Sequence, residues 1–168
     1  QRPWQGQEES GSCETKIQYD PKCYLCPGNT RANGETNPNY DSTYIFVNDF
    51  SALIKDVEKV EHNESDLIKA ESEKGICKVV CFSPRHDLTI ANLSIDEIKN
   101  VISVWKNEYE ILGAEPFINH VQIFENKGSV MGCSNPHPHG QIWAQESIPM
   151  EPLKELQNFK KYYDVHKS

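Results

Sequence analysis

The sequence predicts an α+β fold, a mostly antiparallel sheet with helices on one side. Two observations lead to this prediction: segments with strand character outnumber helical ones, and no strand–helix–strand alternation appears along the chain. At 168 residues the chain has the length of one ordinary domain with a substantial core, so we expect a single domain over residues 1–168.

Four segments have the composition of strands. Residues 43–47 are β-branched and aromatic, and residues 76–82 are apolar at almost every position, which indicates a largely buried strand. We expect two further strands at residues 117–124 and 141–144. Residues 55–74 are charged and lack a sustained apolar period, so they predict a surface insertion with short helical pieces.

Two segments predict helices. The clearer one starts at Ser94, which forms a capping box with Glu97, and it ends at Gly113. Apolar residues at alternating spacings of three and four predict one face packed on the sheet: Ile95, Ile98, Ile102, Trp105, Tyr109 and Leu112. Pro152 opens a second helix. Four apolar residues of this second helix are expected to face the protein interior: Leu153, Leu156, Phe159 and Tyr163.

Composition and charge exclude several classes of protein. A net charge of −8 disfavours a protein that coats nucleic acid, since that role needs a basic face. No apolar run approaches the ~18–20 residues of a membrane span, and no signal-peptide pattern opens the chain. The six cysteines are more typical of thiols or metal ligands than of a disulfide framework, so the expected location is the cytoplasm. The start at Gln1 suggests a piece of a longer protein.

The pair Cys23 and Cys26 has the spacing that lets two thiolates share one tetrahedral ion. One such pair supplies only half a site, and the other cysteines and the six histidines are candidates for the rest. Zinc held also by His86 and His137 would connect this Cys-x2-Cys knuckle to the histidine segment. The alternative is that both cysteines are ordinary buried thiols.

The segment 132–141 holds two histidines around one proline. Pro138 fixes its own φ angle and pushes His137 toward an extended conformation. Residues two apart in an extended chain leave from the same face, about 6–7 Å apart. His137 and His139 are therefore expected side by side, in an arrangement that suits chemistry at a phosphate.

A metal ion on His137 would leave His139 free to react. Imidazole has a pKa of about 6.5, so it is largely neutral at pH 7. One ring nitrogen is then a good nucleophile, provided that an acceptor such as a main-chain carbonyl holds the N–H of the other. Gln141 lies on the same face, where its amide could hold a phosphoryl oxygen, and Ser134 with nearby amides could hold a second phosphate. The alternative is that both histidines are structural, or that both bind metal.

Residues 132–143 closely resemble the signature of the galactose-1-phosphate uridylyltransferase family, a branch of the histidine-triad superfamily. Further sequence segments match the family in the same order, and their residues resemble those of fungal members most. These blocks are residues 2–7, 23–29, 43–50, 85–90 and 124–128. The resemblance implies a histidine-triad-like fold, a half-barrel antiparallel sheet with flanking helices. It also implies exchange of UMP between UDP-glucose and galactose-1-phosphate through a uridylyl-histidine, in the Leloir pathway.

The resemblance also implies roles for single residues. His139 would be the nucleophile and Gln141 would hold the uridylylated state. The positions that would contact the nucleotide are Ser134, Gly132 and Cys133 at the phosphates, Asn48, Asp49 and Asn126 at uridine and ribose, and Arg2 at a phosphate. The metal ligands would be Cys23, Cys26, His86 and His137 for a structural zinc, and Glu155 for a second metal, iron or zinc, in the full-length parent.

The family has a second, related half that this chain lacks, and it forms homodimers with shared active sites. This chain by itself is therefore expected not to complete the reaction, and the function is assigned to its parent. One alternative is a dinucleoside polyphosphate phosphorylase or nucleotide hydrolase of the same superfamily; Gln141 stands where the hydrolases carry a third histidine, which disfavours hydrolysis. The other alternative is a non-catalytic, zinc-stabilised binding module.

Overall fold

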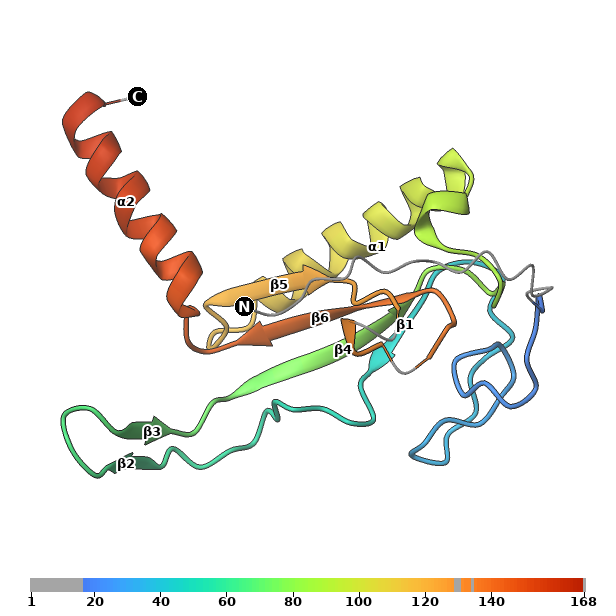
Figure 1. Ribbon diagram of the computed structural model, residues 1–168, viewed down its shortest axis with the longest axis horizontal. Helices are drawn as coiled ribbons and strands as arrows, with labels where there is room; N and C mark the ends of the chain where they lie inside the picture. Colours follow the sequence, from blue (N-terminus) through green and yellow to red (C-terminus); the bar gives the residue numbers. More distant parts are fainter. Residues whose placement is uncertain (1–16, 129–130, 134, 168) are drawn as a thin grey trace, which may run out of the picture.

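The computed structural model describes residues 17–128, 131–133 and 135–167 (Figure 1). Four antiparallel strands form a sheet in the order β1-β4-β6-β5. The bounds of these strands are Tyr44–Val47 (β1), Gly75–Cys81 (β4), His139–Gln145 (β6) and His120–Phe124 (β5). The remaining elements are β2 (Glu61–Asn63), β3 (Lys69–Glu71), the 3-10 helix η1 (Ile90–Asn92), α1 (Ile95–Gly113) and α2 (Met150–His166). The predicted α+β class with an antiparallel sheet is confirmed.

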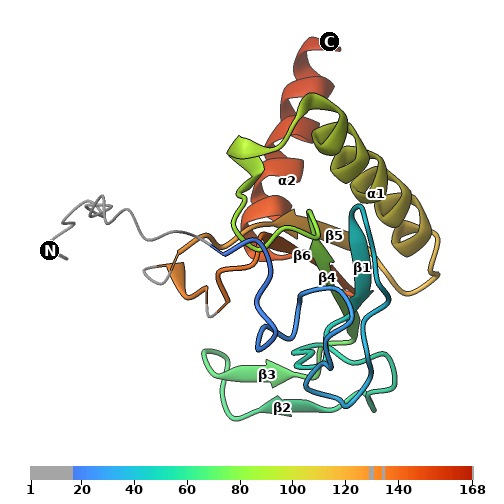
Figure 2. The ribbon, with the colours of Figure 1, turned by 90° about the vertical axis from the view of Figure 1, so that its right-hand side faces the viewer.

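The two faces of the sheet carry different chemistry because side chains alternate along each strand. On β6, Gly140, Ile142 and Ala144 are buried and face the main apolar core together with Val80. Helix α1 covers this face, and the segment that contains Cys23 lies on the other (Figure 2). His139, Gln141 and Trp143 alternate with the core residues and so point to the second face.

Helix α1 has the predicted capping box, in which the Ser94 side chain accepts from the Glu97 N–H and Glu97 reaches back to the Ser94 N–H. The predicted apolar stripe is partly wrong. Ile95, Ile102 and Tyr109 are 74%, 52% and 56% exposed, whereas the helix buries Val101, Glu108 and Leu112.

The helix is turned relative to the predicted stripe, and an ion pair lies on its buried side. Lys78 of β4 points to the α1 face of the sheet, and its Nζ lies 2.5 Å from the Glu108 carboxylate. A charged side chain is costly to bury without a partner. The ion pair with Lys78 therefore explains how α1 can bury Glu108. Hydrophobic spacing alone does not detect such a contact.

Helix α2 begins at Met150, with Pro149 as its N-cap, two residues before the predicted start. It projects away from the sheet and buries no residue within the described part of the chain (Figure 1). The prediction that its apolar face points inward is wrong for this structure. The exposed members of that face are Leu153, Leu156, Phe159 and Tyr163.

Residues 55–74 form an exposed two-stranded hairpin, β2 and β3, so the predicted helical pieces are wrong. Its tip is closed by the main-chain N–H of Glu64, which donates to the Ile68 carbonyl at 3.0 Å, and by the Ser65 hydroxyl. The strand predicted from residue 117 starts only at His120. Within the described residues, no helix combines the length and apolarity that crossing a bilayer requires.

Replacing Gly140 with alanine is expected to destabilise the protein. An added Cβ would lie 2.8 Å from Phe82 Cζ and 2.9 Å from the Phe124 carbonyl oxygen, closer than carbon atoms tolerate. Overpacking of this kind costs about 1–3 kcal/mol of unfolding free energy, which urea denaturation measures. Gly113→Ala is the control, because its added Cβ meets nothing within 4 Å; an equal loss in both variants would contradict the prediction.

Candidate metal centre and active site

Four side chains form a group that could hold a metal ion: Cys23, Cys26, His86 and His137. Their ligand atoms all lie within 4.8 Å of one another, and none of the four residues is more than 9% exposed. The structure thus brings together the four residues that the sequence analysis offered as zinc ligands. Three distant segments meet here: the knuckle, the loop after β4 and the segment before β6.

Two distances within this group match those of a tetrahedral zinc site. The Cys26 Sγ lies 3.5 Å from Nδ1 of His86 and 3.5 Å from Nδ1 of His137. Zinc bonds of about 2.3 Å to sulfur and about 2.0–2.1 Å to nitrogen, at the tetrahedral angle, place two such ligand atoms about 3.5 Å apart. The donor set and its spacing therefore fit zinc.

Neighbouring hydrogen bonds orient the histidine ligand. The His137 Nε2 lies 3.0 Å from the main-chain carbonyl of Ser83, which can only accept, so Nε2 carries the proton and the Nδ1 lone pair points to the group. Burial lowers the pKa of His137 to about 4, so the ring is neutral at pH 7, as a ligand must be.

The thiols have matching donors around them. The main-chain N–H of Leu25 donates to the Cys23 Sγ at 3.4 Å. The His137 N–H donates to Asn135 Oδ1 at 2.9 Å. Both Oδ1 and Nδ2 of Asn135 lie 3.5 Å from the Cys23 Sγ, so this amide can accept from the thiol or donate to the thiolate. Burial raises the pKa of Cys26 to about 11, so without a metal this thiol keeps its proton.

His139 starts β6, and its ring is oriented by the residue two before it. Its Nδ1 lies 2.7 Å from the main-chain carbonyl of His137. A carbonyl oxygen only accepts, so Nδ1 carries the proton and Nε2 carries the lone pair. His139 is not a member of the metal group. The His137 carbonyl is the main-chain acceptor that was expected within the motif.

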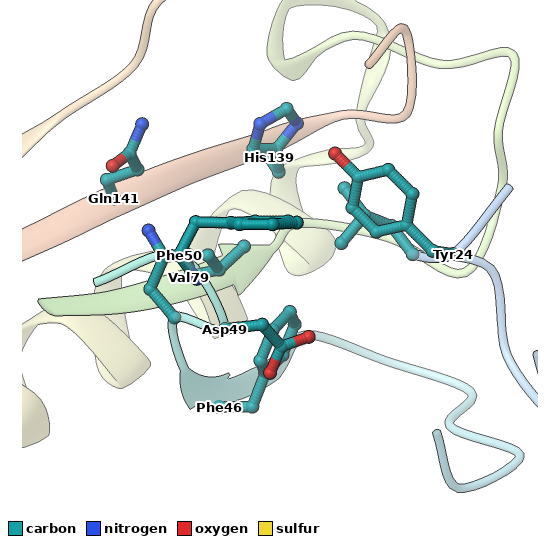
Figure 3. Close-up of a pocket in the computed structure, with 9 residues that line it drawn as sticks. Tyr24, Phe46, Asp49, Phe50, Val79, His139 and Gln141 are labelled. Carbon is teal, nitrogen blue, oxygen red and sulfur yellow. Dashed lines mark hydrogen bonds between the residues drawn. The ribbon is translucent and has the colours of Figure 1, made fainter. Parts of the chain in front are cut away.

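The His139 side chain lines a pocket of about 190 Å³ on the second face of the sheet. Figure 3 shows His139 and Gln141 leaving the same strand, with Asp49 and Phe50 across the pocket. The pocket combines apolar walls with a few convergent polar groups, which is typical of ligand sites. Its lining residues are Tyr24, Leu25, Phe46, Asn48, Asp49, Phe50, Val79, His139 and Gln141.

The structure brings together some predicted site residues and separates others. Asn48, Asp49, His139 and Gln141 meet in the pocket. The others on described residues do not line it: Asn126, Gly132 and Cys133 lie between β5 and β6, and Glu155 is exposed on α2, outside the metal group. Arg2 and Ser134 lie outside the described residues.

Two residues around the pocket, Phe50 and Arg31, have places that the sequence analysis did not predict. Phe50 is 72% exposed, and its main-chain N–H donates to the Asn48 side chain at 2.9 Å, a turn that presents the ring beside the pocket. Arg31 is buried behind the pocket wall, with its Nε 3.8 Å from the Asp49 carboxylate and its guanidinium 4.2 Å from the centre of the Phe46 ring. Phe50 belongs to residues 43–50, which resemble a family block, whereas no spacing in the sequence indicates that Arg31 lies behind Asp49.

Comparison with known proteins identifies the family. Residues 1–149 match the family model described as galactose-1-phosphate uridyl transferase, N-terminal domain. The chain belongs to this family. It is 48% identical over 177 residues to the galactose-1-phosphate uridylyltransferase of Saccharomyces cerevisiae, covering 98% of this chain and 48% of that protein. It is also 48% identical to the enzyme of Haemophilus influenzae, covering 99% and 47%.

These equal identities do not separate fungal from bacterial relatives, so the expected fungal character stays a prediction. A solved structure titled "Structure of uridylyltransferase" superposes with a TM-score of 0.73 at 26% identity, covering 90% of this chain and 48% of that one. The family fold is thus confirmed by structure as well as by sequence. The chain spans about half the length of the family members it matches.

Proposed function

We propose that this chain, residues 1–168, is the N-terminal catalytic domain of a UDP-glucose–hexose-1-phosphate uridylyltransferase. The full-length parent would exchange UMP between UDP-glucose and galactose-1-phosphate in the Leloir pathway of galactose metabolism. The observation that carries this proposal is the state of His139: its Nδ1–H is held by the His137 carbonyl, and its ring lines a pocket outside the metal group. The names of the relatives support the choice of substrates.

In the first step, Nε2 of His139 attacks the α-phosphorus of UDP-glucose. The N–P bond forms as the bond from that phosphorus to the bridging oxygen breaks, and glucose-1-phosphate leaves with the electron pair. The ring becomes positively charged because Nδ1 keeps its proton. The His137 carbonyl, 2.7 Å away, accepts a stronger hydrogen bond from that charged ring, which stabilises the charge as it develops.

In the second step, a phosphate oxygen of galactose-1-phosphate attacks the same phosphorus. The N–P bond breaks, its electron pair returns to Nε2, and UDP-galactose forms. Gln141 lies two residues further on the same face of β6, where its amide NH₂ can donate to a phosphoryl oxygen in both steps. An amide donates without a proton that could leave, so it does not compete with the imidazole for protonation.

The remaining substrate contacts are proposed from the family resemblance. Asn48 and Asp49 line the pocket and would contact uridine and ribose, a role also proposed for Asn126. The residues proposed to contact phosphates are Arg2, Gly132, Cys133 and Ser134. The pocket of about 190 Å³ is smaller than the about 300–1,000 Å³ of typical ligand sites, so we propose that the second half of the parent and the partner of a homodimer complete it.

We propose that the metal is zinc and that its role is structural. It would be held by Cys23, Cys26, His86 and His137, and when bound it would cross-link the knuckle to the segment before β6. Because His137 also supplies the carbonyl that orients His139, this cross-link would hold the nucleophile in place. Glu155 is proposed as one ligand of a second metal, iron or zinc, in the full-length parent. The cytoplasm remains the proposed location, since the described cysteines are all free thiols.

The proposal is tested by trapping the covalent intermediate. The full-length parent is incubated with UDP-glucose alone, digested under mildly alkaline conditions and analysed by mass spectrometry. The peptide that contains His139 is expected to gain the mass of one uridylyl group. Adenylylation from a diadenosine polyphosphate, with none from UDP-glucose, would indicate the phosphorylase or hydrolase branch, and no adduct with either would favour the non-catalytic module.

A further inference from the structure

Trp143 makes a hydrogen bond that neither the family resemblance nor the proposed mechanism uses. Its indole Nε1–H donates to Oε1 of Gln141 at 3.0 Å. We propose that Trp143 is a positioning residue that holds the Gln141 amide with its NH₂ toward the phosphoryl group on His139. This inference rests on the proposed function, in which Gln141 contacts that group.

The chemistry of the indole removes the usual ambiguity of an amide side chain. The oxygen and nitrogen of glutamine are hard to tell apart by shape, but an indole nitrogen can only donate. The atom that Trp143 meets must therefore be the Gln141 carbonyl oxygen. The opposite end of the amide, the NH₂, is then turned away from Trp143 and is free to donate to a ligand.

The sheet places the three side chains in a row. His139, Gln141 and Trp143 occupy alternate positions of β6 and share the face that carries the pocket (Figure 3 shows the first two). The Trp143 ring packs edge-to-face on Phe124 of the neighbouring strand, with 5.9 Å between ring centres. The indole is thus held by packing on β5, so it can restrain a glutamine that is only partly buried.

Without this donor, the Gln141 amide would populate both orientations. In the wrong one a carbonyl oxygen would face the phosphoryl oxygens and repel them. Loss of one neutral hydrogen bond is expected to lower the rate of uridylylation about 3- to 10-fold. The affinity for UDP-glucose should change less, because the phosphoryl contact strengthens as charge develops in the transition state.

The test uses the full-length parent with Trp143→Phe, which keeps an aromatic ring against Phe124 but removes the N–H. The matched control is Trp105→Phe, because the Trp105 Nε1 is buried without a hydrogen-bond partner among the described residues and lies on the core side of the sheet. We expect a 3- to 10-fold lower single-turnover rate of His139 uridylylation in the first variant, with KM for UDP-glucose unchanged, and no loss in the second.

Two further measurements separate positioning from a general structural role. In the double variant Trp143→Phe with Gln141→Ala, the rate should equal that of Gln141→Ala alone, since the two residues act as one unit. In ¹⁵N-labelled protein, the Trp143 indole N–H signal should shift and exchange faster with solvent when Gln141 is alanine.

The proposal is overturned if Trp143→Phe matches the Trp105→Phe control, if the losses add in the double variant, or if the indole signal does not respond to Gln141→Ala. Failure of the proposed function has a different result. In that case the wild-type protein forms no adduct at His139, and the positioning role fails together with it.

Discussion

Replacing His139 with alanine is expected to abolish uridylyl exchange in the full-length parent while leaving the fold and the metal content intact. Removal of a nucleophile that forms a covalent intermediate costs on the order of 10⁴- to 10⁶-fold in rate. The effect on stability should be small, because the ring is only partly buried and its one hydrogen bond among the described residues is to the His137 carbonyl. Such a bond contributes about 1 kcal/mol.

Three measurements on the same preparation check this result: isotope exchange between UDP-glucose and glucose-1-phosphate, zinc content, and urea denaturation. His62→Ala is the control, because His62 is exposed on the β2 strand of the hairpin. If His139→Ala instead lost zinc or unfolded while the remaining folded protein still exchanged uridylyl groups, His139 would be structural and the transferase proposal would be wrong.

Removing the metal is expected to produce the largest loss of stability. Elemental analysis should find about one zinc per chain at the Cys2His2 group, and Cys23→Ser should remove it. The loss of unfolding free energy is expected to be on the order of 5 kcal/mol, since binding to a structural zinc site contributes directly to folding. The segment that positions His139 should become disordered, because His137 would lose its link to the knuckle.

Cys77→Ser is the matched control for this experiment. Cys77 is as buried as the ligands, with 0% exposure, but it lies outside the metal group. Its replacement should therefore retain the zinc and should cost only the burial of a hydroxyl. A wild-type protein that is fully folded and metal-free would refute the metal proposal, and equal zinc loss in both variants would move the site elsewhere.

Features decided by a few neighbouring residues could be predicted from the sequence. The capping box at Ser94 and the β-branched segment around Ile45 each encode their structure locally, and both were found. The four residues of the metal group were named in advance because the Cys-x2-Cys spacing indicates half of a metal site and the family resemblance implies His86 and His137 as the other half. A main-chain carbonyl that fixes the His139 ring was also predicted, although the ring nitrogen that it holds was not.

Features decided by tertiary contacts could not be predicted. The buried face of α1 includes Glu108, a charged residue whose partner Lys78 lies 30 positions earlier on a strand. An apolar stripe on α2 indicates a face but does not show what covers it. The support that Arg31 provides behind Asp49 depends on folding of the loops over the sheet, and no spacing in the sequence reveals it.

The strict alternation along β6 has a consequence for how this region tolerates changes in length. Insertion or deletion of one residue between Pro138 and Gln145 would reverse the facing of the residues on one side of the change, so that the His139 ring and the buried Ile142 could not both keep their places. A β-bulge could absorb one extra residue, but it would interrupt the pairing of Gln141–Gln145 with both neighbouring strands. Among natural variants, length changes should therefore accumulate in the exposed hairpin of residues 61–71 and be absent from this strand.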